Sequence, residues 1–126
     1  MQIHLIAPLI TCAEIEGFVQ DLVKGGHDTL LSGVEEQIQC MMDDVPLNFS
    51  RDGMDATQEL KPIQRISWSI TGWRSASYMQ TFKAGECATF HGKMGLFPLS
   101  RPSGLVIKYE EEYRMAVAMA AAGLGE

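Results

Sequence analysis

The sequence predicts an α+β fold. We expect a mainly antiparallel sheet of about four to five strands, with two N-terminal helices and one C-terminal helix packed on it. Three observations support this: apolar residues recur at helical spacing in the N-terminal part of the chain, residues 65–71 alternate strictly, and the 46% hydrophobic and 21% charged residues are ordinary for a globular protein. A length of 126 residues fits one domain over residues 1–126. The expected order is β-α-α-β-β-β-β-α.

The first strand and the first helix have clear local signals. Residues 3–6 alternate and predict a strand. Thr11 and Glu14 fit a capping box, in which each side chain bonds the other residue's backbone N–H. The apolar stripe that follows at helical spacing consists of Ile15, Phe18, Val19, Leu22 and Val23. Gly25-Gly26 then favours a left-handed stop, so the helix ends there.

A second helix is expected from about Asp28 to Asp43. Leucine, valine, isoleucine and methionine residues in this stretch fall on one helical face. Asp28 fits the N-cap, and a competing capping box at Ser32 would shorten the helix by one turn. Residues 46–61 are rich in turn formers and predict a loop, with one possible helical turn between residues 55 and 60.

The rest of the chain predicts a sheet and a final helix. The expected strands are residues 65–71, 78–83, 87–91 and 105–109. In the first of these, Ile66, Trp68 and Ile70 alternate with polar residues and should face the core. Residues 92–104 contain glycines and prolines and predict a loop. Residues 110–122 predict a helix, because three glutamates fit its first turn.

Charge is distributed unevenly along the chain. Residues 1–60 carry a net charge of −9, residues 61–108 carry +6, and residues 109–126 carry −3, which together give −6. Opposite charges on packed elements can neutralise each other within one fold, and we favour that interpretation. The uneven distribution also limits a charged partner to one of two surfaces of opposite sign.

The first functional hypothesis is a small acidic cytosolic binding protein without enzymatic activity. It would act through a protein–protein surface, as inhibitors, adaptors and immunity-type proteins do, and would self-associate, with a homodimer as the expected form. The acidic residues proposed for this surface are Glu35, Glu36, Asp43 and Asp44. The eight methionines would supply adaptable apolar contacts.

A second hypothesis is a small-molecule-binding or enzymatic α+β domain with a pocket between sheet and helices. The residues expected to line it are Cys12, Trp73, Tyr78, His91 and Lys93. It predicts that at least two of Cys12, His91 and Lys93 lie within about 5 Å of each other. We expect no metal and no cofactor, because the chain contains no pair such as CxxC or HxxxH at ligand spacing.

A third hypothesis is nucleic-acid binding through residues 61–108. This segment holds six of the ten aromatic residues together with its net charge of +6. Aromatic rings stack on bases and cationic side chains hold phosphates. Trp73, Arg74 and Tyr78 are the surface candidates. The acidic balance of the whole chain makes this hypothesis weaker than the other two.

The cysteine count and hydropathy bear on location. Cys12, Cys40 and Cys87 are an odd number at wide spacing, which is typical of free thiols in a reducing compartment, and we expect them to be small buried residues. The opening residues lack the basic region of a secretion signal. Since no apolar segment is long enough to span a bilayer, the sequence predicts a cytoplasmic protein without membrane contact.

Overall fold

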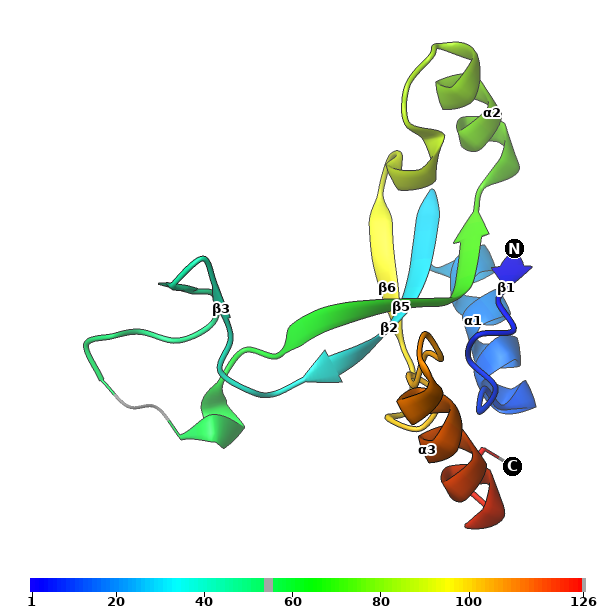
Figure 1. Ribbon diagram of the computed structural model, residues 1–126. Coiled ribbons are helices and arrows are strands. Elements are labelled where there is room, and N and C mark those ends of the chain that lie inside the picture. Colours follow the sequence, from blue (N-terminus) through cyan, green and yellow to red (C-terminus); the bar gives the residue numbers. More distant parts are fainter. Residues whose placement is uncertain (54–55, 126) are drawn as a thin grey trace. The chain divides into compact units, whose positions relative to one another are not determined.

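The computed structural model describes residues 1–53 and 56–125 (Figure 1). The chain forms two compact units. The first consists of Met1–Val34 and Ile66–Glu126, and the second of Glu35–Arg65. Helices and strands are both present along the chain, which confirms the α+β class. One domain over residues 1–126 stays a prediction, which limited proteolysis would test.

The principal sheet has four strands in the spatial order β1-β5-β2-β6. The strands are β1 (Gln2–Ile3), β2 (Thr29–Glu36), β5 (Ile63–Trp73) and β6 (Met94–Pro98). β1 pairs with β5 antiparallel, whereas β6 pairs with β2 parallel, so the sheet is mixed. The first predicted strand is shorter than expected and forms one edge. The strand predicted at residues 65–71 is confirmed within β5.

Helix α1 (Cys12–Lys24) packs on the sheet and forms the core with it. The predicted capping box is present, because Thr11 Oγ1 accepts from the Glu14 N–H at 3.2 Å and Glu14 accepts from the Thr11 N–H at 3.0 Å. Gly26 has the expected left-handed φ of 66°. The buried core cluster consists of Phe18, Leu30, Ile70 and Leu99. In contrast to the predicted stripe, Val19 and Val23 are exposed.

Two glycines, Gly17 in α1 and Gly72 in β5, allow the helix to pack closely on the sheet. A Cβ at Gly72 of β5 would lie 2.5 Å from Leu22 Cδ2 and 3.0 Å from Phe18 Cε1. A Cβ at Gly17 would lie 3.1 Å from the ring of Phe97. The Phe18 and Phe97 rings meet edge to face, with centroids 5.6 Å apart. The helix therefore approaches the sheet more closely than side chains at these two positions would permit.

Glu14 also joins the start of α1 to the loop after β6. Its carboxylate accepts hydrogen bonds from the Ser100 N–H at 2.9 Å and the Ser103 hydroxyl at 2.6 Å, besides those from Thr11. Burial raises the pKa of Glu14, but the bonds from Ser103, Thr11 and Ser100 together outweigh it, and the net pKa is lowered. The loop is thus fixed to the helix by an ionised carboxylate.

The second predicted helix is wrong. Residues 28–43 instead contain β2, whose residues Thr29–Val34 are buried without interruption. A central strand covered on both faces reads as a continuous apolar run, and periodicity alone does not separate such a run from a buried helix. Glu35 and Glu36 therefore stand at the end of a strand and not on a helix.

The elements predicted between residues 78 and 109 also differ. Residues 78–83 belong to helix α2 (Ser75–Lys83), and residues 87–91 contain a single 3₁₀ turn, η2 (Ala88–Phe90). The loop predicted at residues 92–104 contains β6, whose partner lies 65 positions earlier in the chain. Residues 105–109 form no strand; instead the Ile107 N–H donates to the Ile6 carbonyl at 2.8 Å. The final predicted helix is confirmed as α3 (Glu110–Ala121).

The two faces of β5 are not divided as the alternation predicted. Ser67, Ser69 and Thr71 are buried, whereas Ile66 is 40% exposed. Trp68 has a left-handed φ of 59°, which interrupts the alternation of side chains. The hydroxyl of Ser32 on β2 accepts from the Ile70 N–H at 2.8 Å and lies 3.2 Å from Ser67 Oγ. The serines of β5 are therefore part of a buried hydrogen-bond network, and they do not form a solvent face.

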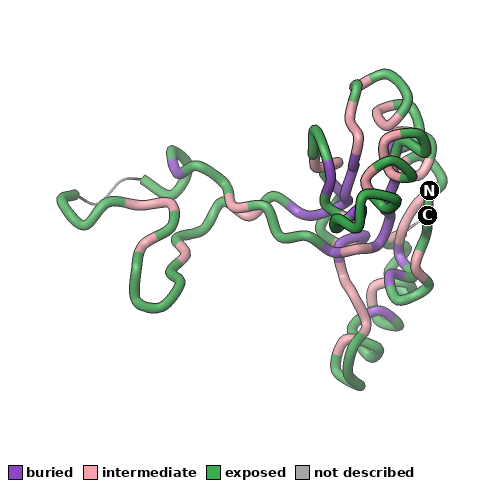
Figure 2. The backbone as a smooth tube through the Cα atoms, turned by 90° about the horizontal axis from the view of Figure 1, so that it is seen from above, coloured by how far each residue is buried: buried purple, intermediate pink, exposed green. Residues whose placement is uncertain are grey.

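The second unit buries few side chains. It contains β3 (Met41–Met42), β4 (Val45–Pro46) and the 3₁₀ turn η1 (Thr57–Glu59). The turn η1 confirms the helical turn predicted between residues 55 and 60. Of its described residues, Leu60 is the one that is buried. Figure 2 shows exposed and intermediate positions along almost all of this segment. Its apolar side chains therefore stay accessible.

Candidate functional site

The carboxylate of Asp28 joins three separate parts of the first unit. Asp28 directly precedes β2, and its Oδ2 accepts from the Lys93 N–H at 2.9 Å. Its Oδ1 accepts from the Ser77 hydroxyl at 3.0 Å and lies 3.5 Å from Arg74 Nε. Gly92 has a φ of 62°, and a Cβ there would collide with the Asp28 carboxylate. The turn at residue 92 therefore requires glycine for two independent reasons.

These contacts favour the ionised form of Asp28. The hydrogen bond from the Lys93 N–H, followed by that from Ser77 and the charge of Arg74, lowers the pKa of Asp28 below its ordinary value of 3.8. A folded-state pKa below the unfolded value means that the contribution to stability is present above pH 3.8 and is lost as the pH falls toward the folded-state value.

We therefore predict a pH-dependent effect for Asp28→Asn. The variant should have a lower melting temperature than wild type at neutral pH, because asparagine loses the charge that the three donors stabilise. The difference should shrink once the pH falls below 3.8. Thermal melts of both proteins between neutral and acidic pH measure it. An equal difference at every pH would contradict this role of the charge.

His91 lies beside this carboxylate network and is 7% exposed. Its Nε2 is 2.9 Å from Ser77 Oγ, and its Nδ1 is 2.6 Å from the Ala88 carbonyl oxygen. The Thr29 hydroxyl lies 3.3 Å from Nδ1 and donates to the His91 carbonyl at 2.9 Å. The imidazole is therefore held on both nitrogens, and the chain Asp28–Ser77–His91 is continuous in hydrogen bonds.

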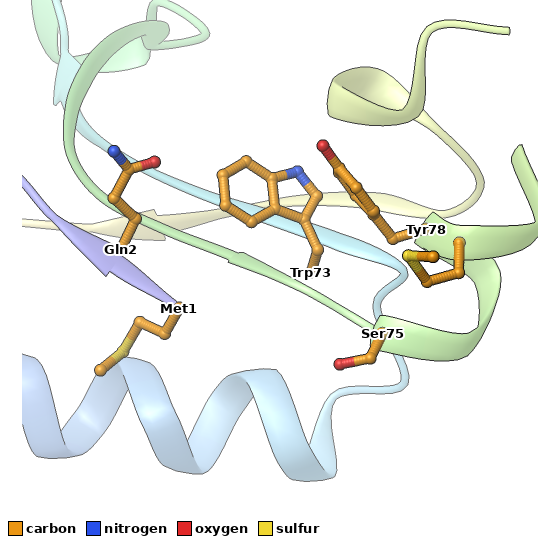
Figure 3. A pocket seen from close by; sticks show the side chains of 6 residues that line it. Met1, Gln2, Trp73, Ser75 and Tyr78 are labelled. Atoms are coloured by element: carbon orange, nitrogen blue, oxygen red, sulfur yellow. The ribbon is translucent and has the colours of Figure 1, made fainter. Parts of the chain in front are cut away.

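Aromatic rings extend this cluster toward an open pocket. The ring centroids of Tyr78 and His91 are 6.0 Å apart, and those of Trp73 and Tyr78 are 5.7 Å apart, both edge to face. Trp73 Nε1 donates to the Thr89 carbonyl at 3.1 Å, which fixes the indole. Figure 3 shows the Trp73 and Tyr78 side chains side by side in the wall of the pocket. The pocket measures about 340 Å³ and is lined by Met1, Gln2, Trp73, Ser75, Tyr78 and Met79.

Five predicted site residues are thus neighbours in the structure. They are Trp73, Arg74, Tyr78, His91 and Lys93. Cys12 does not join them. It begins α1, whereas Lys93 Nζ donates to the carbonyl of Gly25 just beyond the other end of that helix. A helix of 13 residues separates its two ends by about 18 Å. The part of the expected lining that includes Cys12 is therefore wrong.

The four predicted acidic residues lie in the second unit. Glu35 accepts from Gln64 at 3.1 Å, and Glu36 forms a 2.7 Å ion pair with Arg65. Asp43 and Asp44 connect β3 to β4, with left-handed φ angles of 50° and 62°. Two-residue hairpin turns require this conformation, which aspartate tolerates better than most residues. The two aspartates therefore shape the turn, and they do not end a helix as the sequence suggested.

Exposed apolar side chains surround that turn. In the hairpin, Met42 pairs with Val45 and Met41 with Pro46. We call the following residues the hairpin surface: Ile38, Met41, Met42, Val45 and Leu47, together with Asp43 and Asp44. The five apolar members are 52% to 63% exposed. Residues 35–65 carry seven acidic and three basic residues, a net charge of −4. Met41 and Met42 are consecutive in β3 and lie on opposite faces of the hairpin, so it carries exposed apolar side chains on both faces and two carboxylates at its turn.

Two residues of the carboxylate network were missed by the sequence interpretation. Asp28 was expected to cap a helix, and Ser77 was not selected at all. No local pattern identifies them, since the partners of Asp28 lie 49 and 65 positions away. The exposed state of Cys12 and Cys87 also corrects the expectation that the cysteines are buried.

No known family model matches the chain, and no curated protein matches its sequence. Among the residues that the structure describes, no group of three or more His, Cys, Asp or Glu side chains is placed to hold a metal ion. Over the same residues, no helix has both the length and the apolar character needed to cross a membrane.

Proposed function

We propose that this protein is a binding protein that acts through the hairpin surface, in the manner of an adaptor, inhibitor or immunity-type protein, and that it self-associates. The observation that carries the proposal is the exposure of five apolar side chains on a unit with a single buried residue among those described. Exposed apolar side chains next to charged ones are typical of protein-binding sites.

The chemistry of the hairpin surface defines its partner. Methionine side chains adapt to irregular apolar surfaces, and the aspartates at the turn attract cations. The partner surface should therefore present apolar side chains next to lysine or arginine. The left-handed turn projects Asp43 and Asp44 from the end of the hairpin, where each can meet a basic side chain without burial.

A second copy of this chain offers such a surface on α2. Met79, Phe82 and Lys83 recur at helical spacing on one face of this helix. We call these three residues the α2 patch. Its apolar members are 48% and 64% exposed, respectively, and Lys83 is exposed. Reciprocal docking of the hairpin of each copy on the α2 patch of the other would give a closed twofold dimer.

Removing the two turn charges tests the electrostatic part of this proposal. Asparagine favours the same left-handed conformation as aspartate, so Asp43→Asn with Asp44→Asn removes charge and keeps the turn. Exposed ion pairs contribute about 0.2–1 kcal/mol each. Each change occurs twice in a twofold dimer, so we expect the dissociation constant of the dimer to rise roughly tenfold. Sedimentation velocity over a protein dilution series measures it.

Salt and a second acidic pair provide the controls. Wild type should dissociate further at high salt, and the double variant should respond less. Glu110→Gln with Glu111→Gln removes the same charge from the first turn of α3 and should leave self-association unchanged. A wild-type protein that stays monomeric at all concentrations would refute the self-association part of the proposal.

A further inference from the structure

The pocket beside Trp73 has the size and the setting of a small-molecule site. It measures about 340 Å³, and ligand pockets typically measure about 300–1,000 Å³. The register of β1 and β5 places Gln2 opposite Thr71, so Gln2 lies on the same face of the sheet as Trp73, two positions further along β5. Helix α2 contributes three more residues of the lining, Ser75, Tyr78 and Met79. Elements from three parts of the chain therefore form the pocket.

Two aromatic rings form a corner of this pocket. The planes of Trp73 and Tyr78 meet at 63°, and both side chains are half-buried. The indole is fixed by its hydrogen bond to the Thr89 carbonyl, and the Tyr78 ring packs edge to face on the buried His91. A flat ligand that stacks on one of the two rings turns its edge toward the other, and aromatic pairs prefer both of these geometries. Because the rings are already held, a ligand does not have to order them.

The polar groups of the lining are uncharged. The amide of Gln2 and the hydroxyl of Ser75 supply them, and no acidic or basic side chain is among the described residues that line the pocket. Arg74, between Trp73 and Ser75 in the chain, is paired with Asp28 instead. A charged ligand would lose hydration in this pocket without gaining a side chain of opposite charge, so the lining favours an uncharged one.

The amide of Gln2 defines the edge of such a ligand. Figure 3 shows this amide turned toward the indole of Trp73. An amide presents a hydrogen-bond donor beside an acceptor, and it pairs with a planar edge that carries an acceptor beside a donor, as the edge of an aminopurine does. The aromatic corner and the amide therefore select a flat ring with a polar edge.

From this geometry we propose that the pocket binds a small uncharged heteroaromatic compound with a donor beside an acceptor on its edge, such as an aminopurine. The ring lies in the corner of Trp73 and Tyr78, and its edge bonds to the amide of Gln2. Met79, which also belongs to the α2 patch, covers the ring with an adaptable apolar side chain. A single copy of the chain forms the whole pocket, so this proposal does not depend on self-association through the hairpin surface.

The test uses adenine, purine and the full chain labelled with ¹⁵N. Titration with adenine should shift the NMR signals of the Trp73 indole N–H and the Gln2 side-chain amide, with a Kd in the low millimolar range or below. The indole N–H of Trp68, which lies outside the lining, should not shift. Purine has the same ring without the amino group, and it should bind about fivefold more weakly because it lacks one hydrogen bond.

Two matched variants show whether Gln2 reads the edge of the ligand. Gln2→Leu changes an exposed residue, so the fold is kept, and it should lower the affinity for adenine to that for purine. Gln80→Leu changes an exposed glutamine of α2 outside the lining and should bind adenine like wild type.

Three results would overturn the proposal. The first is that neither compound shifts the Trp73 signal, or that both shift Trp68 and Trp73 alike, as unspecific stacking would. The second is that adenine binds as tightly to Gln2→Leu as to wild type. The third is that a short single-stranded oligoadenylate binds more tightly than adenine, which would assign the pocket to a base of a nucleic acid strand.

Discussion

Replacement of Phe18 by alanine is expected to lower the free energy of unfolding by about 3–5 kcal/mol. Phe18 is completely buried, meets the ring of Phe97 edge to face and lies against the backbone of Gly72. The side chains around it come from α1, from the strands β2, β5 and β6 and from the segments next to them, which cannot all collapse into the space. This loss is a large share of the 5–15 kcal/mol that holds a typical domain together.

Chemical denaturation monitored by circular dichroism measures this effect. Val23→Ala on the same helix is the matched control, since Val23 is 72% exposed and its truncation should change the free energy of unfolding by less than about 0.5 kcal/mol. If the two variants had the same stability, the packing of α1 on the sheet would be wrong.

Replacing Met42 and Val45 by serine is expected to weaken self-association at least about a hundredfold. Burial of each such side chain contributes about 1.5–3 kcal/mol, and a twofold dimer buries four of them. Since both residues are more than half exposed in the chain itself, the fold should be unaffected. Sedimentation equilibrium gives the dimer dissociation constant, and circular dichroism checks the fold.

A matched pair on α3 controls for the loss of exposed apolar surface in general. Met115 and Val117 are 49% and 52% exposed, and their replacement by serine removes the same kinds of side chain from another surface. This variant should dimerise like wild type. Equal weakening by both pairs would show that apolar exposure matters without a specific role for the hairpin surface.

The sequence predicted those parts of the fold whose signals are local. The capping box of Thr11 and Glu14 and the glycine stop define α1, and the glutamates of the first turn mark α3. β5 is visible from its alternation, although the left-handed Trp68 shifts the pattern of burial within it. Each of these elements is determined by residues close together in the chain.

The predictions that the structure contradicts concern strands whose pairing partners lie far away in the sequence. β2 looked helical because Leu30, Leu31 and Val34 also suit a helix, and only its central place between β5 and β6 decides for a strand. The sequence predicts a loop at β6, because the parallel pairing that makes it a strand joins Thr29 to Met94 across 65 positions. The Met-Met-Asp-Asp-Val-Pro run at residues 41–46 could have indicated a hairpin, since Asp-Asp suits a left-handed turn.

The residues of the candidate site show the same difference between local and distant signals in the sequence. The basic and aromatic residues from Trp73 to Lys93 were selected on composition, and they do gather at one corner. Asp28 and Ser77, which connect them, could not be identified because a hydrogen bond between residues 49 positions apart leaves no pattern in the sequence. Nucleic-acid binding through residues 61–108 stays a prediction. Phe97 cannot stack on a base, because its ring packs against Phe18 in the core.

The most direct test of the proposed binding function is zero-length carbodiimide cross-linking of a mixture of light and isotopically heavy copies of the chain. This reaction joins carboxylates to lysines that are in contact. We predict cross-links between Asp43 or Asp44 of one copy and Lys83 of another, found as peptide pairs that combine one light and one heavy member. Cross-links that join only peptides of the same label, or none between the hairpin surface and the α2 patch, would contradict the account.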